Sequence, residues 1–122
     1  MFIKNNALLK VVSRTLHKNP DELTKDDLKE LVQLDASDLE ADSVEGLQYA
    51  ENLEKLNVAN NALLDITPLK DLTNLVDLDV SGNRLRDITP LNGHFQMQRL
   101  NLSRNNLFTM DISSVAGIVN LE

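Results

Sequence analysis

The feature that most constrains the fold of this chain is an internal repeat. Residues 53–69 (LEKLNVANNALLDITPL) align with residues 75–91 (LVDLDVSGNRLRDITPL), so the period is 22. The same frame returns one period later at Met97, with MQRLNLSRNNL, and one period earlier at Leu31, with LVQLDASD. A unit this short cannot bury its apolar side chains alone, so successive units must stack and share one continuous core.

The repeated skeleton, L-x-x-L-x-L-x-x-N-x-L, is the signature of leucine-rich repeats. Leu56 and Val58 alternate at period two, which places both side chains on one face of a short strand, and Leu78 with Val80 repeats the arrangement. The expected fold class is an α/β solenoid. It is a leucine-rich repeat horseshoe segment with short parallel strands on the concave face and an N-terminal helical cap.

An asparagine follows three of the strand segments, at Asn61, Asn83 and Asn105. These positions fall where the chain turns out of the strand and its backbone becomes buried. A side-chain amide there can both donate to and accept from backbone groups of neighbouring coils. We interpret the three residues as a structural asparagine ladder.

The sequence Asp-Ile-Thr-Pro-Leu occurs after two of the strands. Thr67 and Thr89 are suited to an N-cap, and Pro68 and Pro90 to the first helical position, where no amide donor is needed. We therefore expect a short helical turn on the convex side of each of these repeats.

The second of these convex segments departs from the first, because His94 stands where Leu72 stands and Phe95 stands where Thr73 stands. We expect Phe95 to replace the missing leucine in the core and His94 to face outward. A further departure, at residues 108–114 (FTMDISS), predicts a longer final coil.

Stacked repeats expose their apolar core at both ends unless they are capped. At the N-terminus, one apolar helical face precedes Asn19-Pro20, which is expected to end the helix. A capping-box sequence, Thr24-Lys25-Asp26-Asp27, then predicts a second helix with three inward side chains. The first face consists of Leu8, Val11, Val12 and Leu16, and the second of Leu28, Leu31 and Val32.

The chain thus divides into a helical cap over residues 1–33 and about four repeat coils over residues 34–122. The apolar residues Val115, Ile118, Val119 and Leu121 are followed by no cap, which favours an array truncated at its C-terminus. Alternatively, Leu121-Glu122 is a cloning scar and the last coil caps itself.

Composition excludes several classes of function. The net charge is −7, and residues 21–54 hold twelve Asp and Glu against two Lys, so nucleic-acid binding is not expected. The absence of Cys and of closely spaced His argues against a metal site, and no phosphate loop or nucleophile motif is present. We therefore expect a non-enzymatic monomer without cofactors and without a membrane span.

Residues 34–61 and 65–91 resemble the internalins and related leucine-rich surface proteins of Gram-positive bacteria. The helical cap joined to the strand Leu34-Asp35-Ala36-Ser37, and then Ser43-Val44-Glu45-Gly46-Leu47, resemble the N-terminal cap of that family in order and spacing. This resemblance implies a secreted or wall-attached protein whose concave sheet binds a protein, often on a host cell. No signal peptide is visible at the start of the sequence, so a cytoplasmic location is the alternative.

Outward-facing strand positions define the candidate binding face. Three columns are expected, comprising Gln33, Lys55, Asp77 and Arg99; Asp35, Asn57, Asp79 and Asn101; and Ser37, Ala59, Ser81 and Ser103. The candidate contacts are Lys55, Asn57, Asp77, Asp79, Arg99, Asn101 and Arg104. The face holds no aromatic residue to anchor a partner. It is either part of a larger interface or an ordinary solvated surface.

The favoured hypothesis is a protein-binding module of a bacterial surface or secreted protein that acts in adhesion or host interaction. Two alternatives stay open at this point. One is an intracellular scaffold that regulates a partner enzyme, and the other is a passive spacer domain of a larger surface protein.

Overall fold

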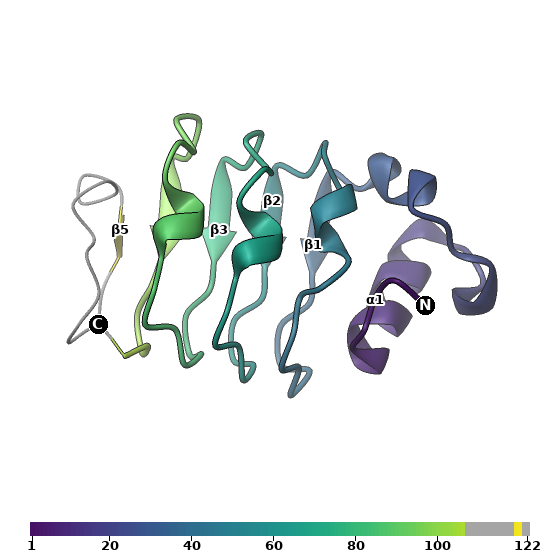
Figure 1. Cartoon of the computed structure of the whole chain (residues 1–122), viewed down its shortest axis with the longest axis horizontal. Helices are drawn as coiled ribbons and strands as arrows, with labels where there is room; N and C mark the ends of the chain where they lie inside the picture. The colour runs from purple at the N-terminus through teal and green to yellow at the C-terminus, as the bar shows by residue number, and fades with distance from the viewer. Residues whose placement is uncertain (107–118, 121–122) are drawn as a thin grey trace.

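The computed structural model describes residues 1–106 and 119–120. Five parallel strands form one sheet in chain order, and the chain climbs through them as a right-to-left stack in Figure 1. Among the first four strands, the register joins equivalent positions of successive repeats, as in Leu34, Leu56, Leu78 and Leu100. The strands are β1 (Gln33–Asp35), β2 (Lys55–Asn57), β3 (Asp77–Asp79), β4 (Arg99–Asn101) and β5 (Val119–Asn120). The predicted leucine-rich repeat solenoid is confirmed.

The helix α1 (Asn6–Leu16) lies at the N-terminal end of the stack (Figure 1). Asn5 caps it by accepting from the Leu8 N–H at 3.0 Å. Its end differs from the expectation, because the helix stops at His17, in the left-handed conformation at φ 58°, before Asn19-Pro20 is reached. The His17 and Lys18 amides close the helix by donating to the last-turn carbonyls.

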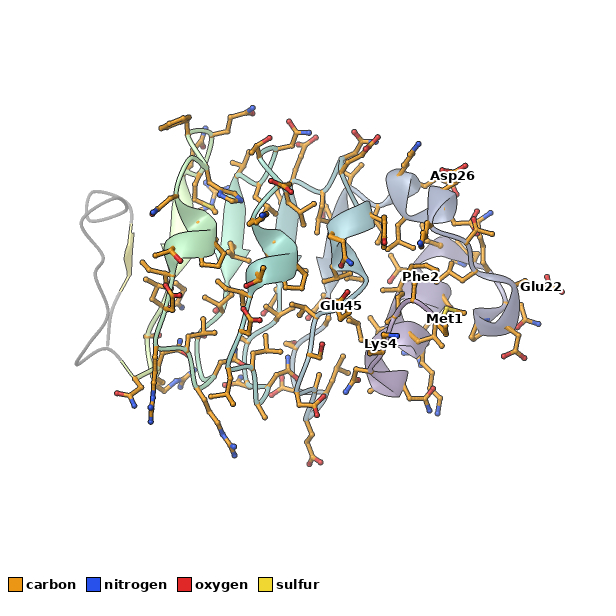
Figure 2. All side chains as sticks on the ribbon, viewed as in Figure 1. Met1, Phe2, Lys4, Glu22, Asp26 and Glu45 are labelled. Carbon is orange, nitrogen blue, oxygen red and sulfur yellow. The ribbon has the colours of Figure 1, made fainter. Side chains whose placement is uncertain are left out.

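The junction between α1 and the first coil is tightly packed. The Phe2 ring, labelled in Figure 2 beside α1, meets the Tyr49 ring edge-on at 5.7 Å. Ile3 is buried against Gly46, where an added Cβ would lie 2.7 Å from Ile3 Cγ1. Gly46 also has φ 108°, so it is a glycine for both steric and conformational reasons.

The second cap segment has the expected capping box but not the expected helix. The Thr24 N–H donates to the Asp27 carboxylate at 2.9 Å, and the Asp27 N–H donates to Thr24 Oγ1 at 3.2 Å. The segment is a 3₁₀ turn, Asp26–Glu30, that buries Leu28. Val32 is 43% exposed rather than inward, because the 3₁₀ turn ends at Leu31, whose backbone is extended (φ −75°, ψ 123°), so the helical face does not continue to Val32.

Short 3₁₀ turns cover the convex side of the first three coils, at Leu47–Tyr49, Thr67–Leu69 and Thr89–Leu91. The expected threonine N-caps are wrong, because the capping acceptor is the aspartate two residues earlier. Asp65 Oδ1 accepts from the Thr67 N–H at 2.8 Å, and Asp87 Oδ1 accepts from the Thr89 N–H at 2.9 Å. This backbone bond is the main reason that the pKa of Asp87 lies below its ordinary value.

The expectation for His94 and Phe95 is also wrong. His94 is buried, with 6% of its surface exposed, whereas Phe95 is 95% exposed. The His94 backbone keeps the position that Leu72 holds one coil earlier, so its side chain enters the core. There Nε2 lies 2.9 Å from the Leu69 carbonyl oxygen and serves as its donor.

The chain also turns at a left-handed residue three positions after each of β1 to β4, and the first coil has a second one at Glu40 (φ 55°). The residues after the strands recur with the period of the repeat, at Asp38 (φ 57°), Asn60 (φ 57°), Gly82 (φ 66°) and Arg104 (φ 55°). The predicted longer turn at residues 108–114 and the expectation of an uncapped C-terminus fall on residues 107–118 and 121–122, which lie outside the described residues.

Candidate functional site

The concave face of the sheet contains a shallow groove with a volume of about 360 Å³. Its lining comes from β1, β2 and β3 and consists of Gln33, Leu34, Asp35, Lys55, Leu56, Asn57, Asp77 and Asp79. The structure thus brings together four of the candidate contacts, Lys55, Asn57, Asp77 and Asp79. Arg99 and Asn101 lie on β4, directly beside Asp77 and Asp79 in the parallel register.

The first outward column contains the longer and more adjustable side chains of the groove. Arg99 Nε donates to Asp77 Oδ2 at 2.9 Å, across the β3–β4 pair. Both side chains are partly exposed, at 58% and 38%, so solvent screens the pair. Lys55, on the neighbouring strand, forms no ion pair with any residue in the described part of the chain.

The second outward column, which contains Asn57, Asp79 and Asn101, has a structural role that the sequence analysis did not predict. Asp79 Oδ1 accepts from both the Ser81 N–H at 2.9 Å and the Ser81 Oγ at 2.6 Å. The same two bonds link Asn101 to Ser103, and Asn57 accepts from the Ala59 N–H at 2.9 Å. The signal for this role is the recurrent Asx-x-Ser spacing at the end of the strand, which is typical of Asx turns.

Asp35 makes the equivalent bonds on β1. It accepts from the Ser37 Oγ at 2.7 Å and from the Ser37 N–H at 3.1 Å. The side-chain bond and then the backbone bond hold the pKa of Asp35 below its ordinary value. This carboxylate therefore keeps its negative charge in the groove at neutral and mildly acidic pH.

The third expected column does not face the groove. Ala59, Ser81 and Ser103 are 5%, 2% and 2% exposed, and only Ser37, in the first coil, is half-buried. The Asx turns fold the chain back at this point, so these small residues pack beneath the turn instead of continuing the strand alternation.

Arg104 also lies apart from the other candidate contacts. It follows β4 in the turn region and lines a separate recess with Arg84 and Arg86, not the concave groove. The alternating pattern of the strand ends before this residue, so strand periodicity could not place it.

The asparagine side chains of the ladder connect each coil to the preceding one. Asn83 is 8% exposed, and its Oδ1 accepts from the Leu63 N–H at 3.0 Å. Its Nδ2 lies 3.0 Å from the Val58 carbonyl oxygen of the preceding coil and 2.9 Å from that of Val80 in its own coil. Asn61 and Asn105 make the equivalent bonds one coil earlier and one coil later, and Asn61 Oδ1 also accepts from the Leu39 N–H.

A second pair of asparagines links coils on the convex side. Asn52 Nδ2 donates to the Lys29 carbonyl and Asn74 Nδ2 donates to the Glu51 carbonyl, both at 2.9 Å. The sequence signal is the Asn-Leu pair that opens successive repeats. Gln96 stands at the next equivalent position, which is another departure in the segment that contains His94.

Within the described residues, no cluster of three or more His, Asp or Glu is placed to hold a metal ion. None of the helices in this part of the chain combines the length and apolar character needed to cross a bilayer. The geometry on the concave side is an open groove with charged and amide groups, suited to contact with a folded partner rather than to enclosing a small molecule.

Comparison with known proteins gives a consistent result. The model of the family described as Leucine Rich repeats (2 copies) matches residues 51–93. An internalin (inlF) from Listeria monocytogenes superposes with a TM-score of 0.85 at 26% sequence identity, over 99% of this chain and 36% of that chain. Internalin C2 from the same species gives a TM-score of 0.81 at 26% identity, over 98% of this chain and 65% of that chain.

A structure of CBM51-2 and INT domains of ZmpB from Clostridium perfringens is also similar. Its TM-score is 0.61 at 30% identity, over 70% of this chain and 19% of that chain. This chain therefore spans less than two thirds of the length of the two internalins and of the Clostridium perfringens structure. The two internalin structures match the cap of this chain as well as its repeats, because the matches cover 99% and 98% of this chain.

Proposed function

We propose that this chain, an internalin-like leucine-rich repeat protein, uses its concave face to bind a protein on the surface of a host cell. As a leucine-rich repeat protein-interaction module, it presents strands that act as a rigid platform. The resemblance to internalins supports a secreted or cell-surface location, and adhesion is the process that such binding serves. A non-enzymatic role is consistent with the open groove.

The observation that carries this proposal is the pre-ordering of the concave side chains. Asn57, Asp79 and Asn101 each use one oxygen in a bond to the residue two positions later. Their second polar atom forms no hydrogen bond with another described residue, which leaves it available to a partner. Side chains already held in one conformation lose less entropy on binding, so a polar face of this kind can gain affinity without aromatic anchors.

The groove supplies only part of a stable interface. Strands about 4.8 Å apart give about 14 Å of width across β1 to β4, whereas a standard interface covers about 800 Å² on each partner. We therefore propose that the partner also contacts surfaces beyond the groove. The exposed pair of Arg99 and Asp77 lies at its β4 side and can re-pair with a partner's charges.

A matched pair of variants tests the proposal. Lys55→Ala with Asp79→Asn changes the concave face, keeps the acceptor for Ser81 and leaves the net charge unchanged. Lys70→Ala with Asp71→Asn makes the same chemical changes on the exposed convex side. Fluorescently labelled protein is incubated with cultured epithelial cells, and saturable binding is measured by flow cytometry with unlabelled protein as competitor.

We expect saturable binding by the unmodified protein and the convex variant, and loss of binding by the concave variant. Circular dichroism of all three proteins verifies that the fold is intact. Equal binding by both folded variants would contradict a concave-face site, and no saturable binding by any of them would contradict the host-surface proposal.

A passive spacer is the second candidate function. It is favoured by the mutual pairing of Asp77 with Arg99 and by the absence of aromatic residues from the concave columns. If the chain is a spacer, neither the concave nor the convex variant should change the binding of a longer protein that contains this segment to the cells. The same flow-cytometry assay therefore separates the two functions.

A further inference from the structure

A recess separate from the concave groove lies where the chain leaves β3 and β4. It has a volume of about 550 Å³ and holds three arginines and one exposed leucine. The leucine, Leu64, is 62% exposed, which is unusual for a large aliphatic side chain in this protein. The lining residues are Leu64, Asn83, Arg84, Arg86, Arg104, Asn105 and Asn106.

None of the three arginines has an acidic partner within the described residues. The ion pairs found there join Lys18 to Asp27 and Glu30, Lys29 to Asp26, and Arg99 to Asp77. The recess therefore concentrates three uncompensated positive charges in a protein whose net charge is −7. Like charges that line one recess repel one another, so their repulsion opposes the fold rather than stabilising it.

The repeat frame does not require arginine at any of these positions. In the preceding coil, the position equivalent to Arg84 holds Ala62 and the position equivalent to Arg86 holds Leu64. The hydrogen bond that Arg84 contributes to the stack comes from its backbone N–H, which donates to the Leu63 carbonyl. Arg104 occupies the left-handed turn position, at φ 55°, where the preceding coil has Gly82. Asp38 and Asn60 hold the same position in the first two coils, so the left-handed turn accepts several residues and does not require arginine.

We propose that this recess binds a short acidic segment of a partner protein, with carboxylates on the guanidinium groups and an aliphatic side chain against Leu64. Guanidinium groups match carboxylates in a planar, two-bond geometry. A polyanion without apolar groups fits less well, because it would leave the exposed Leu64 side chain in the recess without an apolar contact. The site is independent of the concave face, since none of its residues lines that groove.

The test uses the peptide Glu-Glu-Leu-Glu-Glu, blocked at both ends, added to ¹⁵N-labelled protein. Amide and arginine Nε signals are followed at ionic strengths of about 0.01 M and about 1 M, where the Debye length is about 30 Å and about 3 Å. The binding variant is Arg84→Gln with Arg86→Gln. The matched control, Lys10→Gln with Arg14→Gln, removes the same charge from exposed positions on α1.

We expect saturable shifts at residues 84–86 and 104–106 at low ionic strength, loss of most of the affinity at high ionic strength, and about tenfold weaker binding by the double arginine variant. The α1 control keeps the affinity of the unmodified protein. The peptide Lys-Lys-Leu-Lys-Lys produces no shifts at the recess.

Three results would overturn the proposal. The first is the absence of shifts at the recess in a protein whose spectrum is otherwise that of the folded state. The second is an equal loss of affinity in the α1 control, which would show a non-specific charge effect. The third is tighter binding of a heparin hexasaccharide than of the peptide at both ionic strengths, which would assign the recess to a sulfated glycan.

Discussion

The convex segments of two successive coils, residues 66–75 and 88–97, begin alike and then diverge. Each starts with a buried isoleucine and a 3₁₀ turn that buries a leucine, at Thr67–Leu69 and at Thr89–Leu91. Three residues later, the first segment has Leu72-Thr73-Asn74 and the second has His94-Phe95-Gln96. The backbone hydrogen bonds nevertheless correspond in the two segments. The chain differs between them only locally, since Lys70 is helical (ψ −31°) whereas Asn92 is extended (ψ 133°) and Gly93 is left-handed (φ 87°).

The shared backbone bonds explain why the side chains keep their directions. Leu72 donates to the Leu69 carbonyl at 3.1 Å, and His94 donates to the Leu91 carbonyl at 3.2 Å. The following bonds, from Leu75 to Leu72 and from Met97 to His94, also correspond. Turning Phe95 inward would break these buried bonds, so the frame of the solenoid determines which side chain enters the core, whatever its polarity.

Position in the repeat therefore outweighs residue type in these segments. Phe95 forgoes the free energy of burying an aromatic ring, and His94 carries a polar ring into the core. One ring nitrogen finds the Leu69 carbonyl, but Nδ1 is buried without a partner among the described residues. We therefore expect the second segment to be the less stable of the two.

The largest effect is expected for truncation of the two inward side chains. Leu72→Ala should lower the free energy of unfolding by about 2–5 kcal/mol, because it leaves a cavity among fully buried neighbours. His94→Ala should cost clearly less, because it also removes an incompletely paired polar ring. Urea unfolding followed by circular dichroism measures both. Equal losses would show that the two segments contribute the same packing energy.

The next effect concerns a feature that both coils share. Asn83→Ala should cost about 1–3 kcal/mol, because it leaves the buried Leu63 N–H without its acceptor. It also removes one of the two asparagine donors to each of the Val58 and Val80 carbonyls. Asn61→Ala should cost a similar amount. The control is Asn74→Ala, whose single exposed bond can be replaced by water. A control that loses as much as Asn83→Ala would contradict the buried role of the ladder.

The sequence predicts the parts of this molecule that repeat. The period places β1 to β4 and the inward leucines, because backbone bonds and apolar burial both follow it. It does not predict features set by one local contact. The capping of Thr67 by Asp65 and the Asx bonds of Asp79 depend on side-chain geometry two residues away.

The candidate site was only partly predictable for the same reason. Strand alternation correctly brings Lys55, Asp77 and Asp79 to one groove. Alternation ends with the strand, so it could not show that Ser81 is buried or that Arg104 lies in another recess. The prediction for His94 and Phe95 assumed that the apolar side chain is the buried one. The position in the repeat decides instead, and His94 is buried.

A gain in stability is expected where the less stable segment is made like the more stable one. His94→Leu should raise the free energy of unfolding by about 1 kcal/mol, because it replaces a ring with an unpaired nitrogen by the apolar side chain of the preceding coil. The reciprocal variant, Leu72→His, should lose stability. Thermal and urea unfolding at neutral pH compare the two. A loss on His94→Leu would show that the bond to the Leu69 carbonyl outweighs the unpaired nitrogen.

The smallest effect is expected at the neighbouring position. Phe95→Thr introduces the residue that the preceding coil has at this place, and should change the free energy of unfolding by less than about 0.5 kcal/mol, because the ring is 95% exposed. A ring packed in the core would instead cost about 3–5 kcal/mol on truncation to a small residue. Urea unfolding separates these values clearly, so this variant decides between the two orientations of the segment. A loss in the larger range would place Phe95 in the core, and the inward direction would then follow polarity rather than position in the repeat.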